Sequence, residues 1–311
     1  MITKPGSTLT VTLPSDRTIQ LAREFDAPPE LVYAAFSSCE HIKRWLRPCD
    51  MVVSECVMDV RPGGTWRFVH RDSQGNEFGF HGEVREVVPP RRIVRTFEFE
   101  GMPGHVALET LTLEDMGGRT RMVVVSEFAS VEDRDGMLQS GMEEGATESY
   151  AHMADYLREL EAREIVLSRV FDAPRELVFK AWTDPRHIAE WWGPNGFRTT
   201  VHEMEVRPGG VWRFVMHGPD GVDYPNLVEF TEVISPELLV FRHGSGAADD
   251  PGFEVITTFA AEGPKTRLTL RQIHPSAEAR DYVVREVHAV EMGNQTLDRF
   301  AAYLKTASAR G

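Results

Sequence analysis

Two hydrophobic periodicities follow one another along the chain, and their order predicts an α+β fold. Residues 18–25 alternate apolar and polar side chains, which is typical of a half-buried strand. An apolar stripe at helical spacing follows over residues 31–36, and a second short helix is predicted to end at Trp45, before the helix-breaking Pro48. The first folded part of the chain is therefore expected to begin with one strand and two short helices.

The pattern then changes to strands joined by tight turns. Residues 61–64, Arg-Pro-Gly-Gly, fit a type II turn, which requires a glycine with positive φ. A bulge at the second glycine would place Trp66 on the same face as Met58 and Val60, and we favour that register. Further strands are predicted at residues 78–88, 91–99, 105–114 and 119–128. A long closing helix is predicted from an apolar stripe that consists of Ala146, Tyr150, Met153, Leu157 and Leu160.

The same pattern occurs a second time. Phe25-Asp-Ala-Pro and Phe171-Asp-Ala-Pro lie 146 residues apart, and so do Trp66 and Trp212. At this constant offset, residues 23–69 and 169–215 share 23 identical pairs in 47. Chance similarity would not hold one register for so long, so we infer a duplicated domain. The strands of the second copy are predicted near 224–234, 237–243, 253–261 and 265–273, and its closing stripe comprises Gly293, Leu297, Phe300, Leu304 and Ala307.

The predicted organisation is a short N-terminal segment followed by two domains. Residues 1–17 are expected to form a flexible arm or an added edge strand, residues 18–162 the first domain and residues 163–311 the second. Each domain is expected to contain a curved antiparallel sheet, two short helices and a long C-terminal helix. We expect a monomer whose two domains form an intramolecular pair, with a dimer as the alternative.

Composition and charge exclude several classes of protein. With 41% hydrophobic and 26% charged residues, the chain has an ordinary globular composition. Its net charge of −14 offers no basic face for phosphates, so neither a nucleic acid nor an anionic membrane is expected as a partner. The sequence shows no apolar run long enough for a membrane span and no signal peptide, so a cytoplasmic location is the default prediction.

The cysteines and histidines do not form a metal-binding pattern. Cys39, Cys49 and Cys56 are odd in number and fit no zinc spacing, so we expect reduced thiols. No pair of histidines stands at metal-ligand spacing on a predicted helix. Only His41 and His187 share a repeat position, and we assign them surface or capping roles. We therefore expect neither a metal nor another cofactor.

Several motifs of the chain resemble one bacterial family. Phe-Asp-Ala-Pro, the Trp-Trp-Gly-Pro of residues 191–194, Arg-Pro-Gly-Gly-x-Trp-Arg-Phe and the closing segment 297–304 are similar to those of proteins related to the C-terminal domain of the activator of Hsp90 ATPase. The resemblance implies the helix-grip fold of the START and Bet v 1 (SRPBCC) superfamily, which includes carriers, polyketide cyclases, hydrolases and co-chaperones. It therefore implies a fold more strongly than a function.

In a helix-grip domain the space between the sheet and the closing helix can hold a ligand, so we selected candidates around it. All six tryptophans fall in the predicted short helices or in the strand after the glycine turn, which border this space. An aromatic wall for an apolar ligand is one interpretation of their placement, and a filled core is the other. The candidate cavity residues are Trp45, Trp66, Phe68, Tyr150, Met153, Trp191, Trp212, Phe214, Leu297 and Phe300.

Four glutamates are candidates for a polar group in the cavities. Glu83 and Glu86 lie three residues apart on a predicted strand, as do Glu229 and Glu232, so one of each pair should point inward. A buried glutamate could act as a general acid or orient a ligand, whereas an ion pair with Arg61 or Arg207 is the alternative.

The sequence is compatible with three functions. The first is a non-enzymatic protein that binds a small apolar or amphipathic ligand between sheet and closing helix. The second is a chaperone-linked module that acts through protein contacts, as the resemblance implies. The third is a polyketide cyclase-like or hydrolase-like enzyme, which we place last because no nucleophile and base motif is found. A filled interior in both domains would favour the second.

Overall fold

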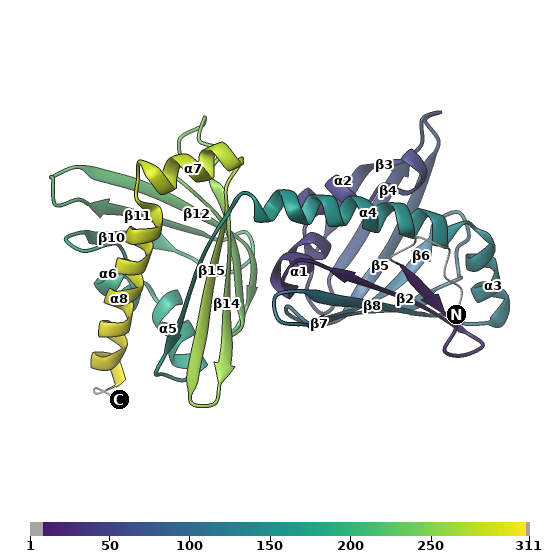
Figure 1. Ribbon diagram of the computed structural model, residues 1–311, viewed down its shortest axis with the longest axis horizontal. Coiled ribbons are helices and arrows are strands. Elements are labelled where there is room, and N and C mark those ends of the chain that lie inside the picture. The colour runs from purple at the N-terminus through teal and green to yellow at the C-terminus, as the bar shows by residue number, and fades with distance from the viewer. Residues whose placement is uncertain (1–8, 309–311) are drawn as a thin grey trace. The chain divides into compact units, whose positions relative to one another are not determined.

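A computed structural model describes residues 9–308 of the protein (Figure 1). The chain divides into two compact units between Glu161 and Ala162. Each unit has one antiparallel sheet with helices, so the predicted α+β class with two tandem domains is confirmed. No helix within residues 9–308 is long and apolar enough to cross a bilayer.

The first unit contains an eight-stranded sheet in the order β1-β2-β8-β7-β6-β5-β4-β3. Its strands are β1 (Thr10–Thr12), β2 (Thr18–Phe25), β3 (Val52–Met58), β4 (Thr65–Arg71), β5 (Glu77–Val88), β6 (Arg92–Phe99), β7 (Ala107–Asp115) and β8 (Thr120–Glu127). Its helices are α1 (Pro29–Ser37), α2 (Cys39–Trp45), the short 3-10 helix η1 (Pro48–Asp50), α3 (Val131–Gln139) and α4 (Met142–Glu161). Figure 1 shows α4 running across the strands of this unit.

The second unit repeats this arrangement without the first edge strand. Its seven-stranded sheet has the order β10-β11-β12-β13-β14-β15-β9. The strands are β9 (Glu164–Phe171), β10 (Arg198–Met204), β11 (Val211–His217), β12 (Asp223–Ile234), β13 (Leu238–Gly244), β14 (Phe253–Glu262) and β15 (Lys265–Ile273). The helices are α5 (Arg175–Thr183), α6 (Pro185–Trp191), α7 (Ala277–Arg285) and α8 (Ala289–Ser308).

The described part of the N-terminal segment is an edge strand and not a flexible arm. β1 pairs with β2 in antiparallel register, with Thr10 opposite Ala22. Leu9 and Val11 are buried, so apolar burial adds to the hydrogen bonds that fix the strand. Residues 1–8 of the predicted arm lie outside the described residues.

The glycine turns have the predicted geometry in both units. Gly63 has φ 80° and Gly209 has φ 75°, a region that side chains disfavour. Trp66 lies opposite Met58 on the neighbouring strand, and Trp212 lies opposite Met204. The favoured register, which turns the tryptophans toward the interior, is therefore confirmed.

Two helices, α3 and α7, were not predicted from the sequence. Neither contains a buried residue, and α3 has no apolar stripe, whereas Val283 and Val284 of α7 are half-buried and pack against the core of the second unit. The remaining signal is the N-cap serine, since Ser130 Oγ accepts from the amide of Asp133 and Ser276 Oγ accepts from the amide of Ala279.

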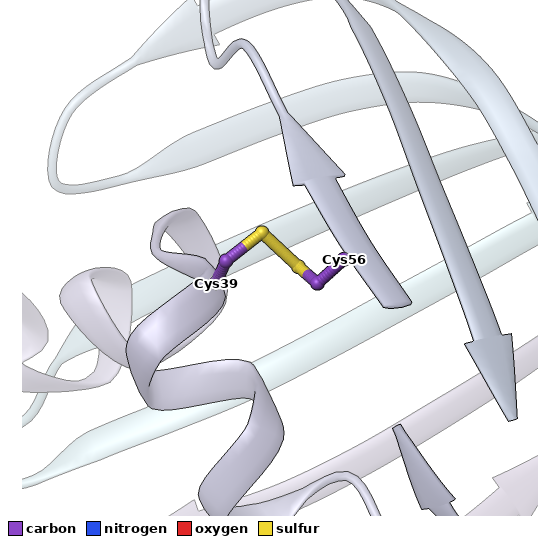
Figure 2. Close-up of a disulfide and its surroundings, with 2 residues drawn as sticks. All are labelled: Cys39 and Cys56. Carbon is purple, nitrogen blue, oxygen red and sulfur yellow. A yellow bond between two sulfur atoms is a disulfide. The ribbon is translucent and has the colours of Figure 1, made fainter. Parts of the chain in front are cut away.

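The expectation of reduced thiols is wrong for two of the three cysteines. Figure 2 shows Cys39, at the start of α2, joined to Cys56 of β3 by a disulfide, with a Cα–Cα distance of 5.6 Å. The packing of α2 against β3 brings these residues together, and their separation of 17 residues in sequence does not reveal it. Cys49 is exposed and lies outside the disulfide. The cysteines therefore give no support for a reducing compartment, and a cytoplasmic location stays a prediction.

Candidate functional site: an aromatic cavity in the first unit

The first unit encloses a cavity of about 700 Å³. Strands β2 and β4 to β8 supply one wall, α1, α2, η1 and α4 supply another, and α3 also contributes to the lining. Most of the lining is apolar, and its aromatic members are Phe36, Trp45, Trp66, Phe68, Phe78, Phe80, Phe97, Phe99, Phe128 and Tyr150. A space of this volume is typical of sites for small organic ligands.

Hydrogen bonds to the backbone hold the two tryptophans of the wall in place. Trp45 Nε1 donates to the carbonyl of Ala35 over 2.8 Å, and Trp66 Nε1 donates to the carbonyl of Thr96 over 3.1 Å. The second bond needs Gly82, because a Cβ at this position would lie 2.7 Å from Trp66 Nε1 and 1.9 Å from the Thr96 carbonyl oxygen. The indole N–H groups are thus satisfied, and the rings present apolar faces to the cavity.

Two charged side chains also line the cavity, and they pair with each other. Arg95 Nε and Nη2 each lie 3.1 Å from Glu109 Oε2, and both side chains are about four-fifths buried. The Arg95 guanidinium also stacks over the Trp66 ring at 4.4 Å from its centroid. The hydroxyl of Ser126 donates to the other carboxylate oxygen of Glu109 over 3.5 Å. The pair is therefore neutral as a unit, with both oxygens of the carboxylate engaged.

Two further polar groups in the lining have no partner within residues 9–308. Ser149 of α4 is 2% exposed and His70 of β4 is 5% exposed. Neither Ser149 Oγ nor His70 Nδ1 makes a hydrogen bond with another described residue. Burial lowers the pKa of His70 below its ordinary value, so the imidazole is neutral at pH 7. Buried polar groups without partners are rare in folded proteins and require an explanation.

Several exposed lining residues lie in the β6–β7 loop and at the α3–α4 junction, and Cys49 of η1 is exposed as well. Met102 in the β6–β7 loop is 56% exposed, and Ser140 and Gly141 at the α3–α4 junction are exposed as well. His105 Nδ1 lies 2.5 Å from Asp133 Oδ1 and joins this loop to α3. The hydrogen bond from His105 lowers the pKa of Asp133, so the rim carries a carboxylate at neutral pH.

In the second unit the equivalent space is occupied by aromatic side chains. Trp192, at the position of Leu46, lies 5.0 Å from Trp212 and 6.1 Å from Phe214 between ring centroids. The closing helices α4 and α8 begin 147 residues apart, at Met142 and Ala289, so Phe300 stands at the position of Met153. Its ring centroid lies 4.1 Å from that of Trp191. These residues belong to one hydrophobic cluster that spans the interior of the unit.

The polar lining of the first unit has mostly apolar counterparts in the second. At the offset of 146 residues, Arg95 corresponds to Phe241 and Glu109 to Val255, which are 3% and 2% exposed. His70 corresponds to Met216. The two units therefore share a fold and differ in the side chains that face the space between the sheet and the closing helix.

The candidate residues chosen from the sequence divide into three groups. Trp45, Trp66, Phe68 and Tyr150 line the cavity of the first unit, where Tyr150 stacks on Trp45 at 5.9 Å. Met153 is fully buried in the core of that unit. The five candidates of the second unit lie in its packed cluster, and they are Trp191, Trp212, Phe214, Leu297 and Phe300.

The expectation that one glutamate of each pair points inward is wrong. A β-bulge between Val84 and Glu86 adds one residue to the strand, so Glu83 and Glu86 lie on the same outer face and Val84 points inward. Glu83 pairs with Arg85 and Glu86 pairs with Arg92, and neither glutamate lines the cavity. The alternative, an ion pair, is confirmed for Glu83 and Glu86, but their partners are Arg85 and Arg92 and not Arg61.

The second pair of glutamates meets the same irregularity. β12 has its bulge between Phe230 and Glu232, at the equivalent position of the repeat. Glu229 lies opposite Arg242 and Glu232 opposite Val240, on either side of the inward Phe241, so both glutamates lie on the outer face.

The two histidines at equivalent positions join the second short helix to the closing helix, and the expected surface position is wrong for His41 only, because the His187 side chain is 28% exposed. His41 Nδ1 lies 2.7 Å from the Tyr156 hydroxyl, and His187 Nδ1 hydrogen-bonds the Tyr303 hydroxyl. His41 is 2% exposed. The contact ties the second short helix to the closing helix in both units.

The sequence interpretation missed the polar residues of the cavity, although a signal for two of them was present. Arg95 interrupts an inward apolar alternation of Ile93, Phe97 and Phe99 on one strand. Comparing the repeats position by position would also have shown Arg95 and Glu109 opposite apolar residues. Within residues 9–308 there is no cluster of His, Cys, Asp or Glu that could hold a metal ion.

The comparison with known families agrees with the fold and the repeat. The family described as Activator of Hsp90 ATPase homolog 1-like protein matches residues 26–158 and again residues 172–305. The chain therefore belongs to this family, with two tandem copies of its domain.

Solved structures with similar folds include single-domain and two-domain proteins. A protein from Rhodobacter sphaeroides is 28% identical, with 49% of this chain and 99% of that chain covered and a TM-score of 0.46. Protein Ms6760 from Mycobacterium smegmatis is 29% identical over 48% of this chain and 94% of its own, with a TM-score of 0.44. The di-domain ARO/CYC BexL from the BE-7585A biosynthetic pathway is 15% identical over 93% and 98%, with a TM-score of 0.39. No curated protein matches the chain.

Proposed function

We propose that the first unit binds a small, largely aromatic molecule in its cavity. The observation that carries the proposal is the space of about 700 Å³ with aromatic walls. Protein interiors are normally packed with few voids larger than a water molecule, so a space of this size needs a reason. The second unit, on the same fold, fills the equivalent space with Trp192 and Phe300. The open interior is thus a property of the first unit's side chains and not of the fold.

This proposal ranks ahead of the two other functions for separate reasons. A module that acts only through protein contacts gives no reason for an aromatic cavity. A cyclase or hydrolase would need a general acid or base in the cavity. Glu109 already accepts hydrogen bonds from Arg95 and Ser126 at its two oxygens, which leaves the imidazole of His70 as the buried candidate, so this function ranks second. A ligand of about a dozen carbons would bind with roughly micromolar affinity after the costs of association.

The test is a calorimetric titration of the full chain with two- and three-ring aromatic compounds. Leu46→Trp places in the first unit the side chain that fills the second, so we expect affinity to fall at least about tenfold. Val57→Trp is the matched control, because it adds the same indole at a position that is 54% exposed. Leu46→Phe provides a milder variant if the first one folds poorly. The proposal fails if no aromatic compound binds with a Kd below about 100 μM. It also fails if the Leu46→Trp and Val57→Trp variants bind the aromatic compounds with equal affinity.

A further inference from the structure

We infer that the ligand carries a neutral hydroxyl or carbonyl group, rather than a carboxylate, and that Ser149 and His70 select it by hydrogen bonding. This inference rests on the proposed function, since it concerns the polar part of the same cavity. Two features support it: the balance of charge in the lining, and the two buried polar groups that lack partners.

The charge balance disfavours an anionic ligand. Arg95, the cation of the lining, is paired with Glu109 and stacked over Trp66. A carboxylate that approached Arg95 would have to compete with Glu109 or stand beside it, and a buried charge without its own partner is costly. At the rim, the carboxylates of Asp133 and Glu132 add negative charge. His105 forms a hydrogen bond with Asp133. An anion therefore meets repulsion at the rim and finds no unpaired cation in the lining.

The unpartnered groups suit a neutral polar group. A serine hydroxyl can donate and accept, and a neutral imidazole offers one donor and one acceptor. Ser149 and His70 are already removed from water, so a ligand hydroxyl that reaches either of them recovers a hydrogen bond without a new desolvation cost on the protein side. They stand on opposite walls, α4 and β4, so they enclose the ligand between helix and sheet.

The repeat provides a comparison for these two positions within the chain. In the second unit, where the interior is filled, methionine stands at the position of His70. At the 147-residue offset of the closing helices, Thr296 on α8 stands at the position of Ser149. The second unit has a buried histidine of its own, His274, which is 5% exposed, so the contrast concerns the position of His70 alone. Thr296 provides a control position with a hydroxyl outside the cavity of the first unit. Thr296 Oγ1 donates to the carbonyl of Met292 over 3.0 Å, so its hydroxyl is already satisfied.

The experiment compares 2-naphthol, 2-methylnaphthalene and 2-naphthoate by calorimetric titration into the full chain at pH 7.5. The hydroxyl and the methyl group are similar in size, but the hydroxyl costs more to dehydrate. Affinity for naphthol at least equal to that for methylnaphthalene therefore requires hydrogen bonds in the cavity. We expect naphthol to bind at least as tightly as methylnaphthalene, and naphthoate to bind most weakly of the three.

The variants identify the groups that select the hydroxyl. Ser149→Ala and His70→Phe should each weaken naphthol binding by about three- to tenfold while changing methylnaphthalene binding less than about twofold. Thr296→Ala should change neither. Ser149→Ala removes a hydroxyl that makes no hydrogen bond in the protein, so it decides the question if His70→Phe does not fold.

Each other outcome is informative. If naphthoate binds most tightly, Arg95 anchors an anion and the inference is overturned. If methylnaphthalene binds and the naphthol preference is the same in both variants, the inference fails while the proposed function stands. If none of the three compounds binds below about 100 μM, and none of the larger aromatic compounds does so either, the proposed function fails with it.

Discussion

The two units of this chain have the same fold and different interiors. In both, a histidine of the second short helix bonds a tyrosine of the closing helix. In both, a tryptophan at the end of the second short helix donates to a carbonyl of the first short helix, Trp45 to Ala35 and Trp191 to Ala181. The side chains that differ are those that decide whether the space between sheet and helix is open or filled.

This comparison separates the residues that build the fold from those that set its use. The shared contacts join helices to one another and to turns, so they position the closing helix whatever lies beneath it. The differing positions, such as Leu46 and Trp192 or Arg95 and Phe241, face the space itself. Function in this family should therefore be sought in the inward positions that differ between copies, and not in the motifs that define the family.

The largest expected effect concerns the disulfide, which only the first unit has. Cys39→Ser removes a cross-link between residues 17 apart, and the chain-entropy relation gives a loss of about 3 kcal/mol in the free energy of unfolding. Pro185 and His202 stand at the equivalent positions of the second unit, so its stability should not change. Hydrogen exchange read by mass spectrometry reports the two units separately within the full chain.

Cys49→Ser is the matched control, because Cys49 is exposed and lies outside the disulfide. Equal protection of the first unit in Cys39→Ser and in the unmodified chain would show that the cross-link contributes little. Equal loss in both units would show that their stabilities are coupled.

The fold could be predicted in detail because its signals are local and are present twice. The strands expected at 78–88 and 224–234 are observed at Glu77–Val88 and Asp223–Ile234. Alternation, a helical stripe and a glycine turn each depend on neighbours within a few residues, and the second copy tests each assignment independently.

The site could be predicted only in part, because its state depends on contacts between distant residues. The sequence indicated the aromatic wall, but whether it encloses space depends on side-chain volumes summed over several elements. The prediction that one glutamate of each pair points inward failed for a local reason. A bulge that no glycine or proline marks in the sequence reversed the alternation of side chains after Val84. The disulfide depends on how α2 meets β3, which no spacing along the chain reveals.

A second prediction tests whether the charged pair of the first unit replaces the apolar pair of the second. Arg95→Phe introduces the residue found at the equivalent position, but it leaves Glu109 about four-fifths buried without its partner. We expect a loss of about 2 kcal/mol in stability, less than for a fully buried pair. The double variant with Glu109→Val should be more stable than either single variant, which denaturant unfolding of all four proteins would measure.

Additive effects of the two substitutions would contradict this prediction. They would mean that Arg95 and Glu109 act independently, and that the cavity does not rely on their mutual neutralisation. Arg85→Phe is a suitable control, because the Arg85–Glu83 pair is exposed and should contribute no more than about 1 kcal/mol.

The smallest effect concerns pH and a residue of the second unit, His243, whose counterpart in the first unit is Phe97. The His243 ring packs 5.0 Å from Phe253, and its Nε2 lies 2.9 Å from Asn226 Oδ1. Burial lowers the pKa of His243 from 6.5 to about 4, with the carboxylate of Asp250 opposing the shift. Between these values the unfolded chain binds a proton that the folded unit does not, so this contribution to stability is complete above pH 6.5 and is lost as the pH falls toward 4.

From pH 7 to pH 5 the second unit should therefore lose about 1–2 kcal/mol through this residue. His243→Phe should reduce the pH dependence of hydrogen exchange in the second unit by that amount and leave the first unit unchanged. The exposed His202→Phe should have no such effect, and an unchanged pH dependence in His243→Phe would mean that the imidazole titrates normally in the folded protein.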